Sequence, residues 1–240
     1  MFSAFSFGKI IKVILPGAIL TTAFLLILEA IWGLLFPGDG FLLAKVPADW
    51  VTAVSAGLIP LSLILGFFLN TFTWMALNQR MRSRCDAELN TTIYRSMREQ
   101  FSQAIWTDYS SYLTQKGLAH APTAPPPRAS LEYYYLPWMD LTNLNYVWES
   151  YFCWYEFDIN SACALVLCFP SAVLLLWVKM PQCHILLLVL TAPLLVLAFG
   201  IYKILSRAAV KNLASYEKNL MLLISGSLVK STNDSKTKTP

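Results

Sequence analysis

The chain has 240 residues, of which 56% are hydrophobic and only 13% are charged, and its formal net charge is +4. Soluble globular domains carry about 25% charged residues, and the mean hydropathy of +0.52 is high for that class. These values exclude an ordinary soluble domain and predict an integral membrane protein.

Four stretches are long enough to cross a bilayer as helices, because a hydrocarbon core about 30 Å thick needs roughly 20 mostly apolar residues. They cover residues 13–36, 51–77, 161–178 and 185–205. Prolines and glycines fill the short connection between the first two, and only a few residues separate the last two. The sequence therefore predicts an all-α membrane protein with two transmembrane helical hairpins, in residues 1–78 and 160–205.

Lysine and arginine positions predict the orientation, because basic loops resist transfer across the membrane. If both ends and the loop between the hairpins are cytoplasmic, 16 of the 18 basic residues lie inside, and only Lys45 and Lys179 lie outside. We therefore expect a multi-pass protein of the bacterial inner membrane with both termini in the cytoplasm. The positive charge is then mostly this asymmetry, so the lipid bilayer is an expected partner and nucleic acid is not.

The chain outside the spans predicts a small cytoplasmic helical layer. Apolar residues at every fourth position after the second span indicate a helix, and clustered prolines indicate a linker. The next stretch has eleven aromatic residues in 25 positions, which is typical of the headgroup layer. We expect a cytoplasmic loop at 79–159, which contains a helix at about 83–116, the linker at 121–130 and an aromatic juxtamembrane segment at 133–158. After the second hairpin we expect a C-terminal helix at 206–225 and a disordered tail at 226–240.

Glu29 is the only acidic residue inside a predicted span, and an ionisable group at membrane depth indicates a functional site or a packing contact. Counting inward from the outer ends of the spans places several hydroxyl groups at a comparable depth. The predicted intramembrane polar layer consists of Glu29, Ser55, Ser62, Ser171 and Thr191. One interpretation is an ion, proton or ligand site. The other, which we expect, is a protonated Glu29 that hydrogen-bonds across helices.

Three carboxylates in the aromatic segment are the clearest candidates for acid–base chemistry at the membrane surface. They are Glu149, Glu156 and Asp158. A basic cluster at the inner end of the second span consists of Arg80, Arg82 and Arg84. Ion pairs between the two groups require nothing unusual, so we expect pairing rather than catalysis.

The same segment contains the pattern P-x5-N-x5-E-x-Y-x3-Y-x2-D directly before the third span. Its residues are Pro137, Asn143, Glu149, Tyr151, Tyr155 and Asp158. This pattern resembles a family of uncharacterised bacterial four-helix integral membrane proteins, which carry such a segment between two helical hairpins. The chain departs from the family's pattern at Trp138, Met139, Thr142 and Glu156. The resemblance implies the two-hairpin topology and a role for the juxtamembrane segment.

The sequence contains no GxSxG, HExxH, P-loop or GxGxxG pattern, so no catalytic residue is predicted. Five cysteines without a CxxC pair and two histidines indicate neither a disulfide framework nor a metal site, and no cofactor is expected. We expect a non-enzymatic membrane subunit that docks a partner or forms a homo-oligomer through its cytoplasmic helices and aromatic segment. The alternatives are a pore-forming or membrane-perturbing effector, for example of a bacterial defence or stress system, and a lipid-modifying enzyme.

Overall fold

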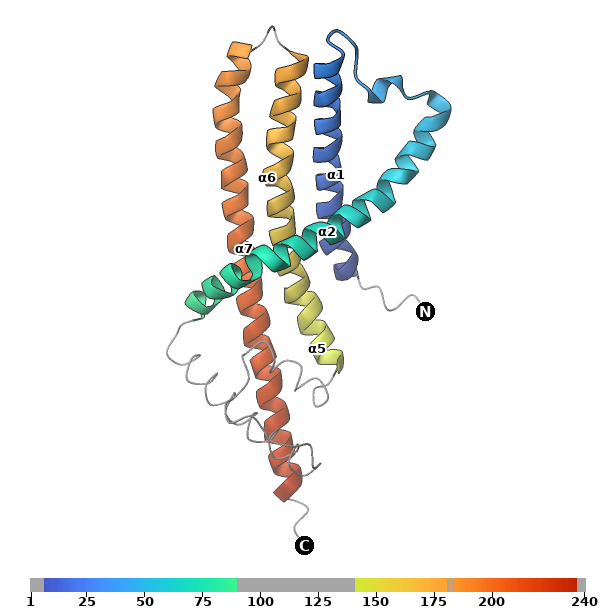
Figure 1. Ribbon diagram of the computed structural model, residues 1–240. Coiled ribbons are helices and arrows are strands. Elements are labelled where there is room, and N and C mark those ends of the chain that lie inside the picture. The colour runs from blue at the N-terminus through green and yellow to red at the C-terminus, as the bar shows by residue number, and fades with distance from the viewer. Residues whose placement is uncertain (1–6, 90–140, 181, 183, 237–240) are drawn as a thin grey trace, which may run out of the picture. The chain divides into compact units, whose positions relative to one another are not determined.

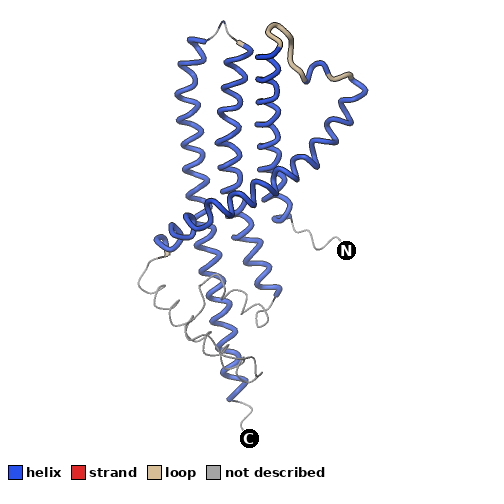
Figure 2. Tube along the Cα trace, in the orientation of Figure 1, coloured by secondary structure: helices blue, strands red, loops and turns tan. Residues whose placement is uncertain are grey.

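The computed structural model describes residues 7–89, 141–180, 182 and 184–236. Within these residues the fold is all-helical and contains no strand (Figure 1, Figure 2). The elements are α1 (Phe7–Leu35), the short 3-10 helix η2 (Leu43–Lys45), α2 (Ala48–Glu88), α5 (Leu141–Val147), the π-helical η3 (Trp148–Phe152), α6 (Cys153–Lys179) and α7 (His184–Lys236).

Four helical stretches are long and apolar enough to cross a membrane. They are Ile11–Leu35, Ala48–Glu88, Leu144–Lys179 and Leu187–Leu223. These stretches confirm the predicted all-α fold and indicate a multi-pass membrane protein.

The last three of these helical stretches are 41, 36 and 37 residues long, well beyond the roughly 20 that a span needs. A helix already formed in its apolar part propagates into polar sequence at little cost, because each added residue gains a hydrogen bond without new nucleation.

The extension is greatest in α7. The sequence predicted a fourth span to residue 205, a separate helix at 206–225 and a disordered tail from 226, whereas α7 is continuous from His184 to Lys236. The single Gly226 does not end the helix, since one interior glycine costs only about 1 kcal/mol. On α2, the helix reaches Glu88. The rest of the helix predicted at 83–116, the linker at 121–130 and residues 133–140 of the aromatic segment lie outside the described residues.

Two compact units divide the chain. Unit 1 consists of Met1–Arg82 and Cys153–Asn212, and unit 2 consists of Ser83–Phe152 and Leu213–Pro240. Unit 1 therefore contains α1, α6 and most of the apolar length of α2 and α7, and unit 2 contains α5, η3 and the C-terminal part of α7.

Very close helix packing characterises unit 1. Helices α1 and α6 lie side by side (Figure 1), and α2 approaches α1 at two glycines. A Cβ atom on Gly17 would lie 1.9 Å from the carbonyl oxygen of Ser62, and one on Gly66 would lie 2.2 Å from that of Val13. Small residues permit such contacts between membrane helices, whose association depends on van der Waals packing rather than on the hydrophobic effect.

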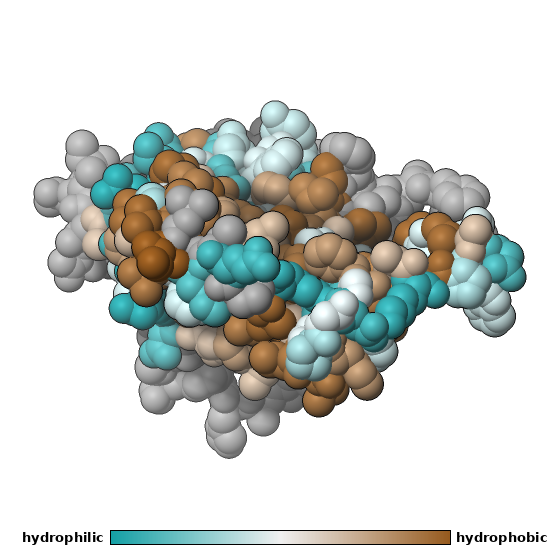
Figure 3. Space-filling model, turned by 90° about the horizontal axis from the view of Figure 1, so that it is seen from above, coloured by the Kyte–Doolittle hydropathy of each residue, from teal (hydrophilic) through white to brown (hydrophobic). Residues whose placement is uncertain are grey.

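Large apolar side chains are exposed on the long helices, among them Phe68 at 69%, Ile185 at 86% and Val196 at 71%. Figure 3 views the molecule from the end at which α1 connects to α2 and α6 connects to α7, and hydrophobic groups remain on the surface there beside hydrophilic ones. Exposed apolar surface on this scale is unusual for a soluble protein. It is what contact with lipid requires of a membrane helix.

Unit 2 has a small aromatic group. The Trp148 ring stacks on Phe152 with ring centroids 6.1 Å apart, and Phe152 contacts Tyr216 of α7 at 5.1 Å. Val147 and Leu213 are buried in the same unit. The aromatic segment therefore packs on the C-terminal part of α7.

Candidate functional site

An ion pair joins α1 to α6 close to the N-terminal ends of both helices. The Lys12 ammonium donates a hydrogen bond to the carboxylate of Glu156. Both side chains are largely buried, with 14% and 9% of their surfaces exposed. Removing a charge from water costs several kcal/mol, so each group depends on the other for its stability. In apolar helices, an ionisable pair is the first candidate for a functional site.

Asn160, one turn after Glu156, connects this ion pair to α2. Its side chain is fully buried, its Nδ2 donates to Asn70 Oδ1 at 2.8 Å, and its Oδ1 accepts from Thr73 Oγ1. Asn70 also hydrogen-bonds to the Glu156 carboxylate. We call Lys12, Asn70, Thr73, Glu156 and Asn160 the Lys12 network.

The Lys12 network also compensates for a break in the hydrogen bonding of α1. Pro16 has no backbone N–H, so the carbonyl of Lys12, four residues earlier, has no donor within its own helix. Asn160 Nδ2 donates to that carbonyl at 3.3 Å. An unsatisfied carbonyl inside a membrane costs several kcal/mol. Asn160 therefore stabilises α1 at its proline as well as holding three helices together.

Two further polar contacts join helices of unit 1. Asn212 Nδ2 of α7 donates to Asp158 Oδ2 of α6 at 2.8 Å. The hydroxyl oxygens of Thr21 and Ser62 lie 3.0 Å apart, between α1 and α2. Each of the four long helices of unit 1 thus makes at least one polar contact with another.

A second polar site fixes the loop between α1 and α2. Glu29, on the last turns of α1, accepts the backbone N–H groups of Leu42 at 2.9 Å and Leu43 at 2.7 Å, one on each carboxylate oxygen. These N–H groups begin η2 and have no partner within it. A carboxylate suits the N-terminal end of a helix, because the exposed N–H groups there carry partial positive charge. Glu29 therefore caps η2 from a neighbouring helix.

Two lysines hold the same loop. Lys179, at the end of α6, donates to the carbonyl oxygens of Asp39 at 3.2 Å and Gly40 at 2.9 Å. Lys45 forms an ion pair with Asp39 at 2.6 Å and lies 4.9 Å from the ring centroid of Trp32. These are the two basic residues that the predicted topology places outside. The loop clamp, as we name this group, consists of Glu29, Asp39, Lys45 and Lys179.

The polar layer predicted from the sequence needs correction. Glu29 caps η2, and Ser62 contacts α1 rather than Glu29. Ser171 and Thr191 each donate to the carbonyl four residues earlier in their own helix, and Ser55 is exposed. In the part of the chain that the structure describes, no hydrogen bond joins two members of the layer. Hydroxyl groups in apolar helices find the nearby backbone carbonyl first, and depth along a helix says nothing about which way a side chain faces.

The six residues of the juxtamembrane pattern lie in different environments. Tyr155 and Asp158 are buried in α6, Glu149 and Tyr151 are partly buried in η3, Asn143 lies in α5, and Pro137 lies outside the described residues. Of the carboxylates, Glu156 bonds to Lys12 and Asp158 to Asn212. These partners differ from the arginines that the sequence suggested.

The basic cluster at the end of α2 remains largely on the surface. Arg80 and Arg84 are exposed. Arg82 is partly buried, and its Nε donates to Asn78 Oδ1, one turn earlier, at 3.3 Å. The cluster thus contributes no bond to either Glu156 or Asp158 in the described structure.

Sequence reasoning missed Lys12, Asn70, Asn160 and Asn212. Two signals were present. Pro16 leaves the Lys12 carbonyl in need of an outside donor, and Glu156 and Asn160 share a helical face at a spacing of four. Neither feature identifies its partner, since the partners lie on other helices.

Among the described residues, no group of three His, Cys, Asp or Glu side chains lies close enough to hold a metal ion. His184 instead stacks on Trp177, with ring centroids 5.0 Å apart, and its Nε2 lies 3.1 Å from the Trp177 carbonyl in the turn between α6 and α7. Comparisons of the chain with protein-family models, with curated proteins and with solved structures found no match. The resemblance in the juxtamembrane segment stays a prediction.

Proposed function

We propose that the chain is a non-enzymatic integral membrane subunit that docks a protein partner or a second copy of itself through unit 2. The observation that carries the proposal is the aromatic group, in which Phe152 contacts both Trp148 and Tyr216 while Tyr146 is 67% exposed. Tyrosine and tryptophan are enriched among the residues that dominate binding energy at interfaces. Because the aromatic group is already ordered by its own packing, less conformational entropy is lost when it binds a partner.

The polar contacts of unit 1 support a structural subunit over the two alternatives. Of the carboxylates considered for lipid chemistry, Glu156 and Asp158 bond to Lys12 and Asn212. Glu29, the candidate for an ion pathway, bonds to two backbone N–H groups. These side chains hold helices and a loop in place, which favours a scaffold rather than a lipid-modifying enzyme or a pore.

We also propose that the subunit lies in the bacterial inner membrane with unit 2 and both termini in the cytoplasm. The distribution of 16 of the 18 basic residues supports this orientation. Reporter fusions test it: we expect an external signal after Lys45 and His184 and an internal signal after His120 and Lys230. An external signal at His120 would contradict the orientation and the location of the docking surface.

Site-specific photo-cross-linking in intact membranes tests the docking surface. A photoreactive phenylalanine analogue replaces Tyr146, and the matched control carries it at Phe68 of α2, an aromatic residue that is 69% exposed. We expect a discrete adduct from position 146 and only lipid-sized additions from position 68. An adduct of twice 27.0 kDa identifies a second copy, and another discrete mass identifies a partner.

A Tyr146→Ala variant provides the quantitative test. Loss of an interface anchor typically weakens binding by about 2 kcal/mol, or roughly 30-fold, so on dilution below the dissociation constant the complex recovered in mild detergent should fall by up to that factor. The Phe68→Ala control should leave recovery unchanged. Docking through unit 2 would be refuted if the unmodified chain and the Tyr146→Ala and Phe68→Ala variants gave equal recovery of the complex and position 146 gave no adduct.

A further inference from the structure

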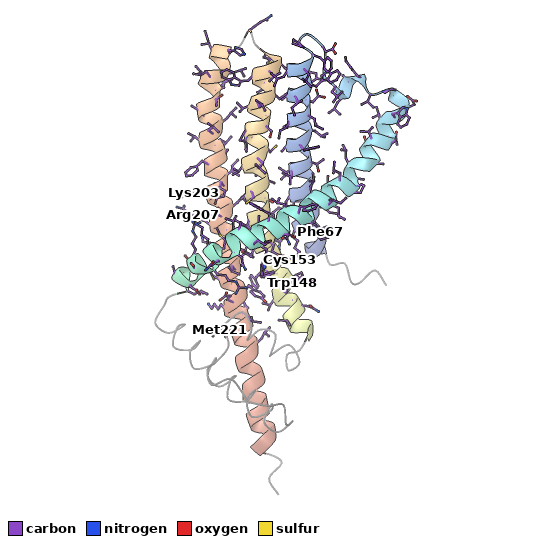
Figure 4. The ribbon with its side chains drawn as sticks, in the orientation of Figure 1. Phe67, Trp148, Cys153, Lys203, Arg207 and Met221 are labelled. Atoms are coloured by element: carbon purple, nitrogen blue, oxygen red, sulfur yellow. The ribbon has the colours of Figure 1, made fainter. Side chains whose placement is uncertain are left out.

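A row of basic side chains runs along one face of α7. Lys203, Arg207 and Lys211 are spaced by four residues and all three are exposed. Figure 4 shows Lys203 and Arg207 on the same side of the helix. At about 1.5 Å per residue, the row is roughly 12 Å long. It straddles the end of the fourth span, which the sequence places near residue 205. We call these three residues the α7 basic row.

The α7 basic row has no acidic partner among the described residues, in contrast to Lys12 and Lys45 of the same unit. Lys12 pairs with Glu156, and Lys45 pairs with Asp39. In the row, Lys203 lies 5.2 Å from the ring centroid of Phe199, an arrangement that keeps its charge close to the helix surface. The row therefore presents concentrated positive charge to whatever lies beside it.

The helical face that carries the row becomes apolar in the direction of the span. Phe199, one turn before Lys203, is 62% exposed, and Val196, one turn before Phe199, is 71% exposed. An amphiphile lying along this face would meet apolar side chains with its tail and cations with its head. Lysine and arginine at such a level extend their charged ends toward the interface, because their stems are apolar.

We propose that the α7 basic row binds the phosphate of an anionic phospholipid whose acyl chain lies along Phe199 and Val196. The guanidinium of Arg207 offers paired donors that match phosphate oxygens, and the two ammonium groups add charge on either side. A free phosphate ion would bind the cations but would make no contact with the apolar residues. A phospholipid would make both contacts. The site does not depend on the docking role of unit 2, because all its residues lie in unit 1.

Native mass spectrometry of the full chain in mild detergent measures the binding. Phosphatidylglycerol is compared with phosphatidylcholine of the same acyl chains, because only the former has a net negative headgroup. The test variant is Lys203→Gln/Arg207→Gln/Lys211→Gln. The matched control, Lys218→Gln/Lys230→Gln/Lys236→Gln, removes three charges from the same helix further along the chain. Each basic residue near a membrane surface contributes about fivefold to the affinity for anionic lipid, so we expect roughly 100-fold weaker phosphatidylglycerol binding in the test variant only.

Two further measurements keep the proposal testable if the triple variant misfolds. In the unmodified chain, about 1 M salt should abolish the preference for phosphatidylglycerol, since it reduces the screening length to about 3 Å. A Lys203→Arg/Arg207→Lys/Lys211→Arg variant should keep the preference, because the charge is unchanged. Equal binding of the two lipids by the unmodified chain, equal losses in test and control variants, or displacement of bound lipid by millimolar inorganic phosphate would each overturn the proposal.

Discussion

The two ends of unit 1 each contain a buried carboxylate, and the two are stabilised in different ways. At the N-terminal ends of α1 and α6, Glu156 meets the ammonium of Lys12, a side chain 144 residues away in sequence. At the loop end, Glu29 meets two backbone N–H groups only 13 and 14 residues away. The first contact holds helices together and the second holds a loop to a helix.

The difference shows that a carboxylate within a predicted span does not by itself indicate an ion pathway. The relevant question is which donor is left unsatisfied nearby. Near Glu29 the unsatisfied donors are the first N–H groups of η2, and near Glu156 the donor is a lysine that hydrocarbon would otherwise isolate. The contact of Glu29 is local, whereas that of Glu156 joins distant segments of the chain. Substitutions at the two ends should therefore have effects of different size and extent.

The largest effect is expected from Glu156→Ala, which leaves the buried Lys12 ammonium without its partner. Breaking a buried ion pair costs about 3–5 kcal/mol, which corresponds to a fall of roughly 10 °C in the midpoint of thermal unfolding. A thiol-reactive dye in mild detergent measures it, because unfolding on heating exposes buried thiols such as those of Cys85 and Cys153. Glu149→Ala, at a partly buried position in η3, is the matched control and should shift the midpoint little.

A double substitution sharpens this result. Lys12→Met/Glu156→Met removes both charges and should recover most of the lost stability, since a buried pair replaced by apolar groups is often neutral. A double variant as unstable as Glu156→Ala would show that the ion pair is not the reason for the loss.

The next effect concerns Asn160 and Pro16. Asn160→Ala should cost about 2 kcal/mol, because the carbonyl of Lys12 loses its donor and Thr73 loses one of its two acceptors. In a Pro16→Ala background, residue 16 regains an N–H and satisfies that carbonyl within α1. The cost of Asn160→Ala should then shrink by about 1 kcal/mol in a double-mutant cycle of unfolding midpoints. Additive effects would contradict the link between the asparagine and the proline.

A smaller effect is expected where α1 and α2 touch. Gly17→Ala places a Cβ atom against the Ser62 carbonyl and should destabilise unit 1 by about 1–3 kcal/mol through forced separation of the backbones. Gly57→Ala, on the same helix as Ser62, is the control, because nothing lies within 4 Å of its Cβ position. It should stabilise α2 slightly, as alanine favours helix over glycine. Equal unfolding midpoints for the two variants would argue against the close contact.

The smallest effect is expected at the loop clamp. Glu29→Gln keeps one acceptor but turns an amide NH2 toward the second N–H, so η2 should lose about 1 kcal/mol of local stability, as when a helix cap is removed. Hydrogen exchange at Leu42 and Leu43, followed by mass spectrometry, should then accelerate about fivefold. Glu156→Gln should leave exchange at these two residues unchanged. Faster exchange there in both variants would show that the two ends are coupled.

The four long helices were predictable from the sequence because the constraint that produces them is local. In hydrocarbon every backbone group needs a hydrogen bond within the structure, and about 20 consecutive apolar residues can meet that requirement only as a helix. The same local rule predicts that Pro16 leaves the Lys12 carbonyl in need of a donor from outside α1. The length of α7 was underestimated because helix propagation beyond the apolar part depends on small free energies that composition does not resolve.

The partners of the polar side chains were decided only by the tertiary structure. Whether Glu156 faces Lys12 or an arginine depends on the rotation of α6 about its axis and its shift along α1, and a rotation of one residue, about 100°, changes every neighbour. The contacts of Gly17 and Gly66 help to fix how α2 lies against α1, and thereby bring Asn70 and Thr73 to Asn160. Apolar length is a property of one segment, whereas a hydrogen bond between segments is a property of their packing, so the sequence determined the helices and the packing decided the site.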